Sequence, residues 1–193
     1  CGEYNNIHPV DKRTPGERLG NCALRQVYGM SRIPVYGPTV LGFRCDEGGR
    51  VRLFFRYAHG LHFSGTAPDS FGDEFAKSLP SLVRLPERSG FELAGADGVF
   101  HPAYAAIFVD CDIDDLVNAK VNVVDYNATE FGIPINSRSI GTITLATPEV
   151  PAPVMMRYAW RSWGPAPLFN DNNLPAHPFK LDLTDHTDSD HAE

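Results

Sequence analysis

The sequence predicts one helical segment near its N-terminus followed by a larger region of β-strands. Two observations lead to this fold class. Apolar residues recur at helical spacing in one early segment, while several later segments alternate between apolar and polar residues. In addition, 16 prolines and 17 glycines among the 193 residues divide the chain into short segments, as is typical of strands joined by turns. This length suits one domain, or part of a larger domain with an accessory domain.

The expected helix begins near Thr14 and ends near Gly29. Thr14 is a candidate N-cap, Pro15 suits the first helical position, and Glu17 would complete a capping box. Gly29 is a plausible C-terminal stop. The apolar residues at helical spacing are Leu19, Cys22, Ala23, Val27 and Met30.

Alternation predicts strands in the remainder of the chain. Residues 38–44 and 50–57 alternate in part, and the Asp46-Glu47-Gly48-Gly49 stretch between them is a hairpin signal. Residues 59–90 read as a long surface loop. Further strands are expected at 91–95, 104–109, 140–145 and 154–160, with a turn at 96–98.

Charge and composition exclude some classes of partner. The net charge of −7 and the pI near 5.4 argue against a nucleic-acid partner, because phosphate backbones require clustered Lys and Arg. No apolar run approaches the roughly 20 residues of a membrane span. The four cysteines form no CxxC pair, so neither a zinc knuckle nor a disulfide scaffold is expected. We expect no cofactor.

Two separated blocks of the sequence resemble the sialate O-acetylesterase family of SGNH-type carbohydrate esterases. The first comprises residues 2–9 (GEYNNIHP), 11–12 and 16–19, and it resembles that family's last catalytic block and the helix after it. The second block is similar to the family's β-domain and its ending. Its parts are residues 91–98, 148–150, 157–160 and 168–179.

The resemblance implies a division of the chain into three parts. Residues 1–32 would be the C-terminal end of an α/β hydrolase domain, with its catalytic histidine loop and last helix. Residues 33–180 would form a β-sandwich-like accessory domain with an insertion near 110–139. Residues 181–193 read as an acidic, flexible tail. The fold class is therefore α/β plus all-β.

The resemblance implies that His8 is the general base of a serine esterase. Histidine suits this role because its unperturbed pKa of about 6.5 lies near working pH, and Pro9 restricts the backbone of His8. Orienting partners could be Glu3, Asn5 or Asn6, a backbone carbonyl or an acid from elsewhere; many relatives have an acidic residue at the position of Asn6. By the residues alone, His8 would read as a turn histidine before a helix.

The family's Gly-Gln-Ser nucleophile block does not occur in this sequence. We therefore expect an upstream segment or a second chain to supply the serine, and the 193-residue chain alone to be inactive. Cys1 could be lipidated or an N-terminal nucleophile, but we favour a fragment start. The resemblance implies an O-acetylated sugar substrate, with sialic acid favoured over xylan, and a secreted or periplasmic location.

Three aromatic residues, Tyr158, Trp160 and Trp163, are candidate sugar contacts, although alternating strand residues are more often core. If they bind glycans without chemistry, the chain would instead be a β-sandwich glycan-binding module. His59 and His62 are three residues apart but lack an evident third metal ligand. The acidic cluster at 110–115 lacks the glycine and glutamate of an EF-hand, so no metal site is expected.

Overall fold

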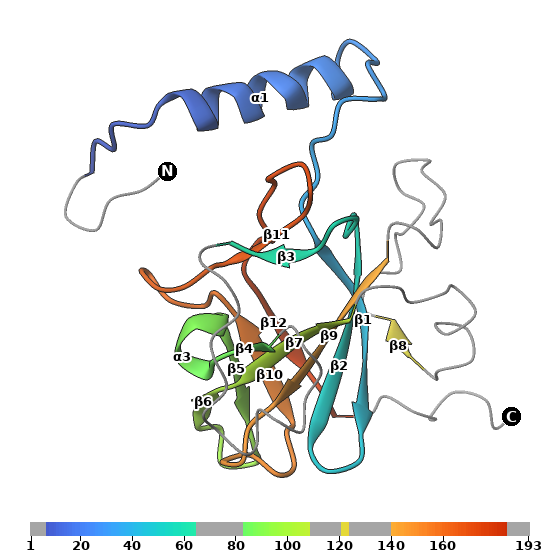
Figure 1. Ribbon diagram of the computed structural model, residues 1–193, viewed down its shortest axis with the longest axis vertical. Coiled ribbons are helices and arrows are strands. Elements are labelled where there is room, and N and C mark those ends of the chain that lie inside the picture. The colour runs from blue at the N-terminus through green and yellow to red at the C-terminus, as the bar shows by residue number, and fades with distance from the viewer. Residues whose placement is uncertain (1–6, 65–82, 109–120, 124–139, 185–193) are drawn as a thin grey trace, which may run out of the picture. The chain divides into compact units, whose positions relative to one another are not determined.

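The computed structural model describes residues 7–64, 83–108, 121–123 and 140–184 (Figure 1). The chain divides into two compact units, residues 1–36 and 37–193. The expected domain boundary after residue 32 stays a prediction. The described part is mostly β-sheet with few helices. Most of the insertion near 110–139 and residues 185–193 of the predicted tail lie outside the described residues. The predicted start of that tail at residue 181 is wrong, because residues 179–182 form a strand and Leu181 and Leu183 are buried in the core.

The first unit contains helix α1 (Arg13–Gln26), which begins close to the predicted position but with a different cap. The backbone N–H of Thr14 donates a 3.0 Å hydrogen bond to Oδ1 of Asp11, and Glu17 pairs instead with Arg13 at 2.6 Å. The prediction that Thr14 and Glu17 form a capping box is therefore wrong. The Asp11 carboxylate is a charged acceptor at the positive end of the helix, and its hydrogen bonds from Thr14 lower its pKa.

Helix α1 ends at Gln26, three residues short of the glycine expected to stop it. Gly29 has a φ of 70° and reverses the chain, so that the N–H of Met30 donates to the carbonyl of Leu24 at 3.1 Å. No residue of α1 is buried: the side chain of Leu19 is 74% exposed, and that of Val27, just after the helix, is 75% exposed.

The second unit begins with the predicted hairpin. Strands β1 (Thr39–Asp46) and β2 (Arg50–Arg56) pair antiparallel, and the turn between them places Gly48 and Gly49 at positive φ, as a tight hairpin requires. These two strands belong to a six-stranded sheet of order β4-β7-β9-β2-β1-β8. Its other strands are β4 (Val83–Arg84), β7 (Tyr104–Phe108), β8 (Asn122–Val123) and β9 (Gly141–Ala146).

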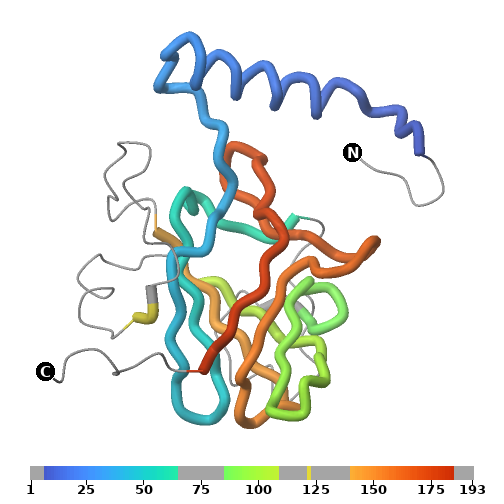
Figure 2. Tube along the Cα trace, turned by 180° about the vertical axis from the view of Figure 1, so that it is seen from behind, coloured from blue at the N-terminus to red at the C-terminus, as the bar shows by residue number. Residues whose placement is uncertain are grey.

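A four-stranded sheet of order β12-β10-β5-β6 completes the main architecture (Figure 2). Its strands are β5 (Phe91–Ala94), β6 (Phe100–Pro102), β10 (Met155–Tyr158) and β12 (Phe179–Asp182). A short helix, α3 (Pro86–Ser89), leads directly into β5. A small third sheet pairs β3 (His62–Phe63) with β11 (Leu168–Phe169). The strands expected at 91–95, 104–109, 140–145 and 154–160 are thus present, with shifted ends.

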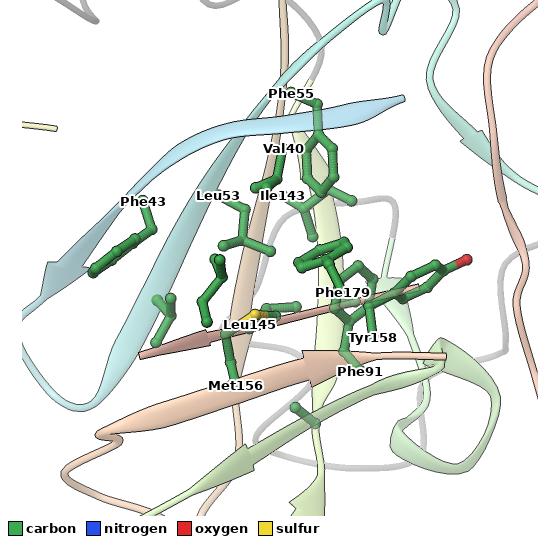
Figure 3. Close-up of a cluster of buried hydrophobic side chains, with 14 of the residues drawn as sticks. Val40, Phe43, Leu53, Phe55, Phe91, Ile143, Leu145, Met156, Tyr158 and Phe179 are labelled. Atoms are coloured by element: carbon green, nitrogen blue, oxygen red, sulfur yellow. The ribbon is translucent and has the colours of Figure 1, made fainter. Parts of the chain in front are cut away.

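One hydrophobic core lies between the six-stranded and four-stranded sheets (Figure 3). Leu53, Phe55 and Ile143 contribute to it from one sheet, and Phe91 and Tyr158 from the other, all with exposures near zero. This packing of two sheets on one core is that of a β-sandwich. In β5 and β10 the alternate residues face away from the core, and they carry the polar groups of the site described next.

Candidate functional site

A pocket of about 340 Å³ lies at one end of the four-stranded sheet, entirely within the second unit. The loop after β10 provides one wall through Trp160, Arg161 and Trp163, while helix α3 and strand β5 provide Glu87 and Glu92. Trp160 and Trp163 are 50% and 55% exposed. The structure thus brings together two of the three aromatic residues predicted as sugar contacts.

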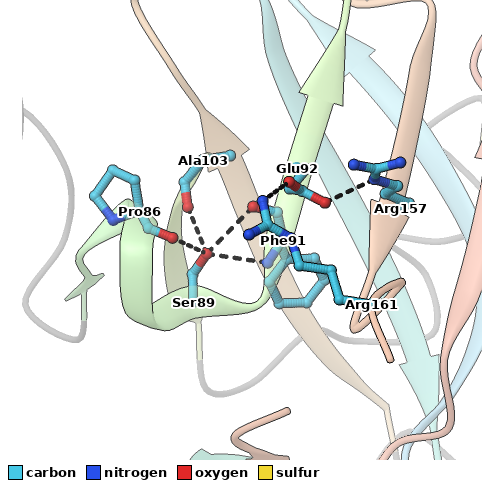
Figure 4. A network of polar contacts seen from close by, with 7 residues as sticks. All are labelled: Pro86, Ser89, Phe91, Glu92, Ala103, Arg157 and Arg161. Atoms are coloured by element: carbon cyan, nitrogen blue, oxygen red, sulfur yellow. Dashed lines mark hydrogen bonds and ion pairs between the residues drawn. The ribbon is translucent and has the colours of Figure 1, made fainter. Parts of the chain in front are cut away.

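Glu92 is the polar centre of this site and is held by two arginines (Figure 4). Its Oε2 accepts a 2.6 Å hydrogen bond from Nε of Arg157, and its Oε1 accepts one from Nη2 of Arg161. The Glu92 side chain is only 7% exposed. Burial acts to raise the pKa of this carboxyl, but the hydrogen bonds and charges of the two arginines outweigh burial and hold the pKa below its usual value.

Strand register explains why Glu92 and Arg157 meet. Residues 91–94 of β5 pair antiparallel with residues 155–158 of β10, which places Glu92 directly opposite Arg157 on the outer face of the sheet. The guanidinium of Arg157 also lies 3.9 Å from the ring centroid of Phe100 on β6. Arg161 follows β10 and reaches the same carboxylate from the loop, with its own side chain 57% exposed.

The turn from α3 into β5 depends on Ser89 and Gly90. The buried Ser89 hydroxyl donates to the carbonyl of Ala103 at 2.6 Å and accepts from the N–H of Phe91 at 3.0 Å. Ser89 is fully buried, so it is a structural residue and not a nucleophile. Gly90 has a φ of 75°, and a Cβ there would come within 2.6 Å of the Pro165 carbonyl oxygen.

Tyr158 does not line the pocket, in contrast to its expected role as a sugar contact. Its side chain is 0% exposed, and its ring packs on Phe91 with the centroids 4.6 Å apart. The hydroxyl accepts a 2.9 Å hydrogen bond from the N–H of Leu168, and burial raises the pKa of the phenol. Because side chains alternate along β10, Tyr158 faces the core while Arg157 faces outward.

His8 is exposed and lies in the segment just before α1 in the first unit. Its three candidate partners in the chain, Glu3, Asn5 and Asn6, lie outside the described residues. The structure therefore locates the predicted base before the helix, and its orienting group stays a prediction.

A second histidine arrangement, not expected from the sequence, joins two turns of the β-unit. Nδ1 of His59 and Oδ2 of Asp171 are 2.6 Å apart, and the N–H of Asp171 donates to the carbonyl of His59 at 3.0 Å. His62 instead contacts the carbonyl of Gly60 at 2.8 Å through its own Nδ1. These two histidines therefore have separate partners. The two hydrogen bonds between His59 and Asp171 connect the segment before β3 to the segment after β11.

Within the described ranges, no three His, Cys, Asp or Glu residues are grouped so that they could hold a metal ion. The described helices are also too short or too polar for any of them to cross a bilayer.

The sequence indicates some features of this pocket but not its assembly. Alternation in 91–93 and 156–158 indicates that Glu92 and Arg157 share the outward direction of their strands. It does not indicate that β5 and β10 are neighbours, because that pairing joins residues 65 positions apart. No sequence pattern indicates that Arg161 belongs to this site.

The fold is similar to that of a solved carbohydrate acetylesterase. The crystal structure of this enzyme, from Xanthomonas citri, matches with a TM-score of 0.59 and 26% sequence identity over 94% of the present chain. The matched part is 30% of that enzyme's chain, so the present chain spans less than a third of its length. No protein-family model matches the sequence, and no curated protein sequence is significantly similar to it. The chain is therefore related in structure to a carbohydrate esterase.

Proposed function

We propose that this chain is the C-terminal portion of a serine carbohydrate esterase and contributes the general base, His8, to its active site. The observation that carries the proposal is the likeness to a carbohydrate acetylesterase over 94% of the chain, at 30% of that enzyme's length. The position of His8 immediately before α1 supports the assignment, since the resembling family has its catalytic histidine before its last helix.

The exposed apolar face of α1 also supports the proposal. Leu19 and Val27 are about three-quarters exposed, although apolar residues at helical spacing normally face a core. Such a face is what a helix would present if it were the last element of a hydrolase domain whose other elements lie in a further segment.

In the proposed reaction the serine nucleophile comes from an upstream segment or a second chain. The imidazole of His8 accepts the serine proton as the hydroxyl attacks the acetyl carbonyl, and then gives that proton to the leaving sugar oxygen. A water molecule next attacks the acetyl-enzyme with His8 again as base, releasing acetate and restoring the serine. The orienting partner of His8 would be Glu3, Asn5, Asn6 or a group of the other segment.

The substrate we favour is a sialic acid that carries an O-acetyl group. This choice rests on two sequence blocks, within residues 2–19 and 91–179, which resemble the sialate O-acetylesterase family. An acetyl-xylan-type esterase would use the same chemistry on a different sugar. Acetate release from O-acetylated sialic acid and from acetylated xylan, compared at equal enzyme concentration, distinguishes the two.

The decisive experiment assays the chain with and without the segment that carries the serine. The 193-residue chain alone should not hydrolyse p-nitrophenyl acetate, whereas the assembled protein should. Replacing His8 by alanine in the assembled protein should lower kcat by on the order of 10³-fold or more, as for other bases of this kind. The His177→Ala variant is a matched control because His177 is also exposed and lies in the β-unit. Near-normal turnover of His8→Ala would disprove the proposed role.

A second candidate function is a glycan-binding module without chemistry of its own. The specific observation in its favour is that Trp160 and Trp163 line one pocket and are both half-exposed. Saturable glycan binding by a chain that stays inactive in every assembly would favour this module over the esterase.

A further inference from the structure

The pocket beside β5 combines exposed aromatic rings with a fixed arginine. Within the described part of the second unit, the large hydrophobic residues left exposed are Val99, Trp160 and Trp163. Both tryptophans line the pocket, whereas Val99 does not. Aromatic residues that gather at a concave site, when a protein otherwise buries such side chains, mark a binding surface.

The loop that carries the tryptophans is held in place on both sides. At its start, the N–H of Ala159 donates to the carbonyl of Gly90 at 2.9 Å, and Arg161 is bonded to Glu92. At its end, the carbonyl of Pro167 accepts from the N–H of Ser64 at 2.6 Å. The pocket is thus formed before any ligand arrives, which limits the conformational entropy lost on binding.

Arg161 provides charged hydrogen-bond donors to the pocket. A guanidinium has five N–H groups, and among the described residues Arg161 uses Nη2 for Glu92. Because the carboxylate holds Nη2 while the side chain stays 57% exposed, the guanidinium is oriented and its other N–H groups are accessible to a ligand in the pocket. Sugar hydroxyl oxygens are suitable acceptors for such donors.

The charges around the pocket select the class of sugar. The charged lining residues are Glu87, Glu92 and Arg161, which sum to one negative charge. Arg157, behind Glu92, brings the total to zero. A carboxylated sugar would therefore meet no net positive charge here, and its carboxylate would compete with Glu92 for Arg161. A neutral ring avoids this competition.

We propose that this pocket binds a neutral pyranose unit of a glycan. The ring packs against Trp160 and Trp163, and its hydroxyls accept hydrogen bonds from Arg161 while Glu92 orients the guanidinium. This proposal rests on the glycan-binding role given above to the two tryptophans and is independent of the catalytic role of His8.

The test is a calorimetric titration of the 193-residue chain with xylohexaose, cellohexaose and sialyllactose. We expect saturable binding of at least one neutral oligosaccharide, with a Kd below about 10 mM. Trp160→Ala and Trp163→Ala should each weaken that binding at least tenfold, while Tyr28→Ala, which removes an exposed aromatic residue of the first unit, should leave it unchanged. Arg161→Ala should also weaken it.

Three results would overturn the proposal: no binding of either neutral oligosaccharide, unchanged affinity in both tryptophan variants, or tighter binding of sialyllactose than of the neutral sugars. Thermal unfolding of each variant separates loss of binding from loss of folding, because half-exposed tryptophans should be replaceable without a large change in Tm. The His8→Ala variant of the 193-residue chain should bind the neutral oligosaccharide with the affinity of the wild type, so this site and the proposed catalytic role of His8 are tested separately.

Discussion

Glu92 and Arg157 face each other across β5 and β10, with Oε2 and Nε 2.6 Å apart on the outer face of the four-stranded sheet. Arg161 approaches the same carboxylate from the loop that carries both exposed tryptophans. One nearly buried carboxylate therefore links the sheet to the wall of the candidate site, and its removal should affect both stability and binding.

Glu92→Gln should destabilise the β-unit. The variant removes the negative charge between two guanidinium groups, of which that of Arg157 belongs to a side chain only 24% exposed. Leaving such a charge without its partner should cost on the order of 1–3 kcal/mol in the free energy of unfolding, measured by urea denaturation. Glu47→Gln, in the exposed hairpin turn, is the matched control and should change little. Equal stability of both variants would contradict a structural role for the Glu92 pairs.

The same carboxylate should make stability depend on pH at the acid end. The folded-state pKa of Glu92 lies below its usual value of 4.5, so the stabilisation is complete above pH 4.5 and is lost as the pH falls through the lower folded-state pKa. Wild type and Glu92→Gln should therefore differ most in unfolding free energy near neutral pH and converge in acid. A stability difference between wild type and Glu92→Gln that grows as the pH falls would contradict a lowered pKa of Glu92 in the folded state.

Gly90→Ala should be more damaging than Gly48→Ala. Both glycines have φ near 75°, so both variants carry the cost of left-handed backbone in a residue with a side chain, about 1–2 kcal/mol. At Gly48 a Cβ would meet nothing within 4 Å, whereas at Gly90 it would lie 2.6 Å from the Pro165 carbonyl oxygen. The excess destabilisation of Gly90→Ala, from denaturant midpoints, therefore reports the close packing of the loop against β5. Equal losses would show that the loop yields without cost.

Tyr158→Phe should lower stability without altering glycan affinity. The substitution removes the acceptor of the Leu168 N–H and leaves that buried donor without it, which should cost about 1–3 kcal/mol. The phenyl ring keeps its packing on Phe91, and Tyr158 does not line the pocket. If Tyr158→Phe lowered glycan affinity as much as Trp160→Ala does, at unchanged Tm, Tyr158 would contact the sugar directly, as the sequence first predicted.

The elements that the sequence predicts well are those whose signals are local. The hairpin of β1 and β2 is recognisable because the alternating segments flank two glycines, and both glycines have the positive φ that the turn needs. Helix α1 is recognisable from its apolar spacing. The predicted cap at Thr14 is wrong because Thr14 lies inside the helix, and the carboxylate that accepts its N–H comes from Asp11, one residue before the N-cap position.

The sequence by itself thus determined the order of the main helix and of the longer strands, and the alternation that gives Glu92 and Arg157 the opposite direction to their apolar neighbours. The tertiary structure decided which strands are neighbours, and hence that Glu92, Arg157 and Arg161 form one network while Tyr158 is enclosed in the core. The physical reason is the sequence distance over which each kind of interaction acts. Backbone and side-chain preferences act over a few residues. The pairing of β5 with β10, and the position of the loop that carries Trp160 and Trp163, arise instead from packing two sheets on a shared core, which no local pattern encodes.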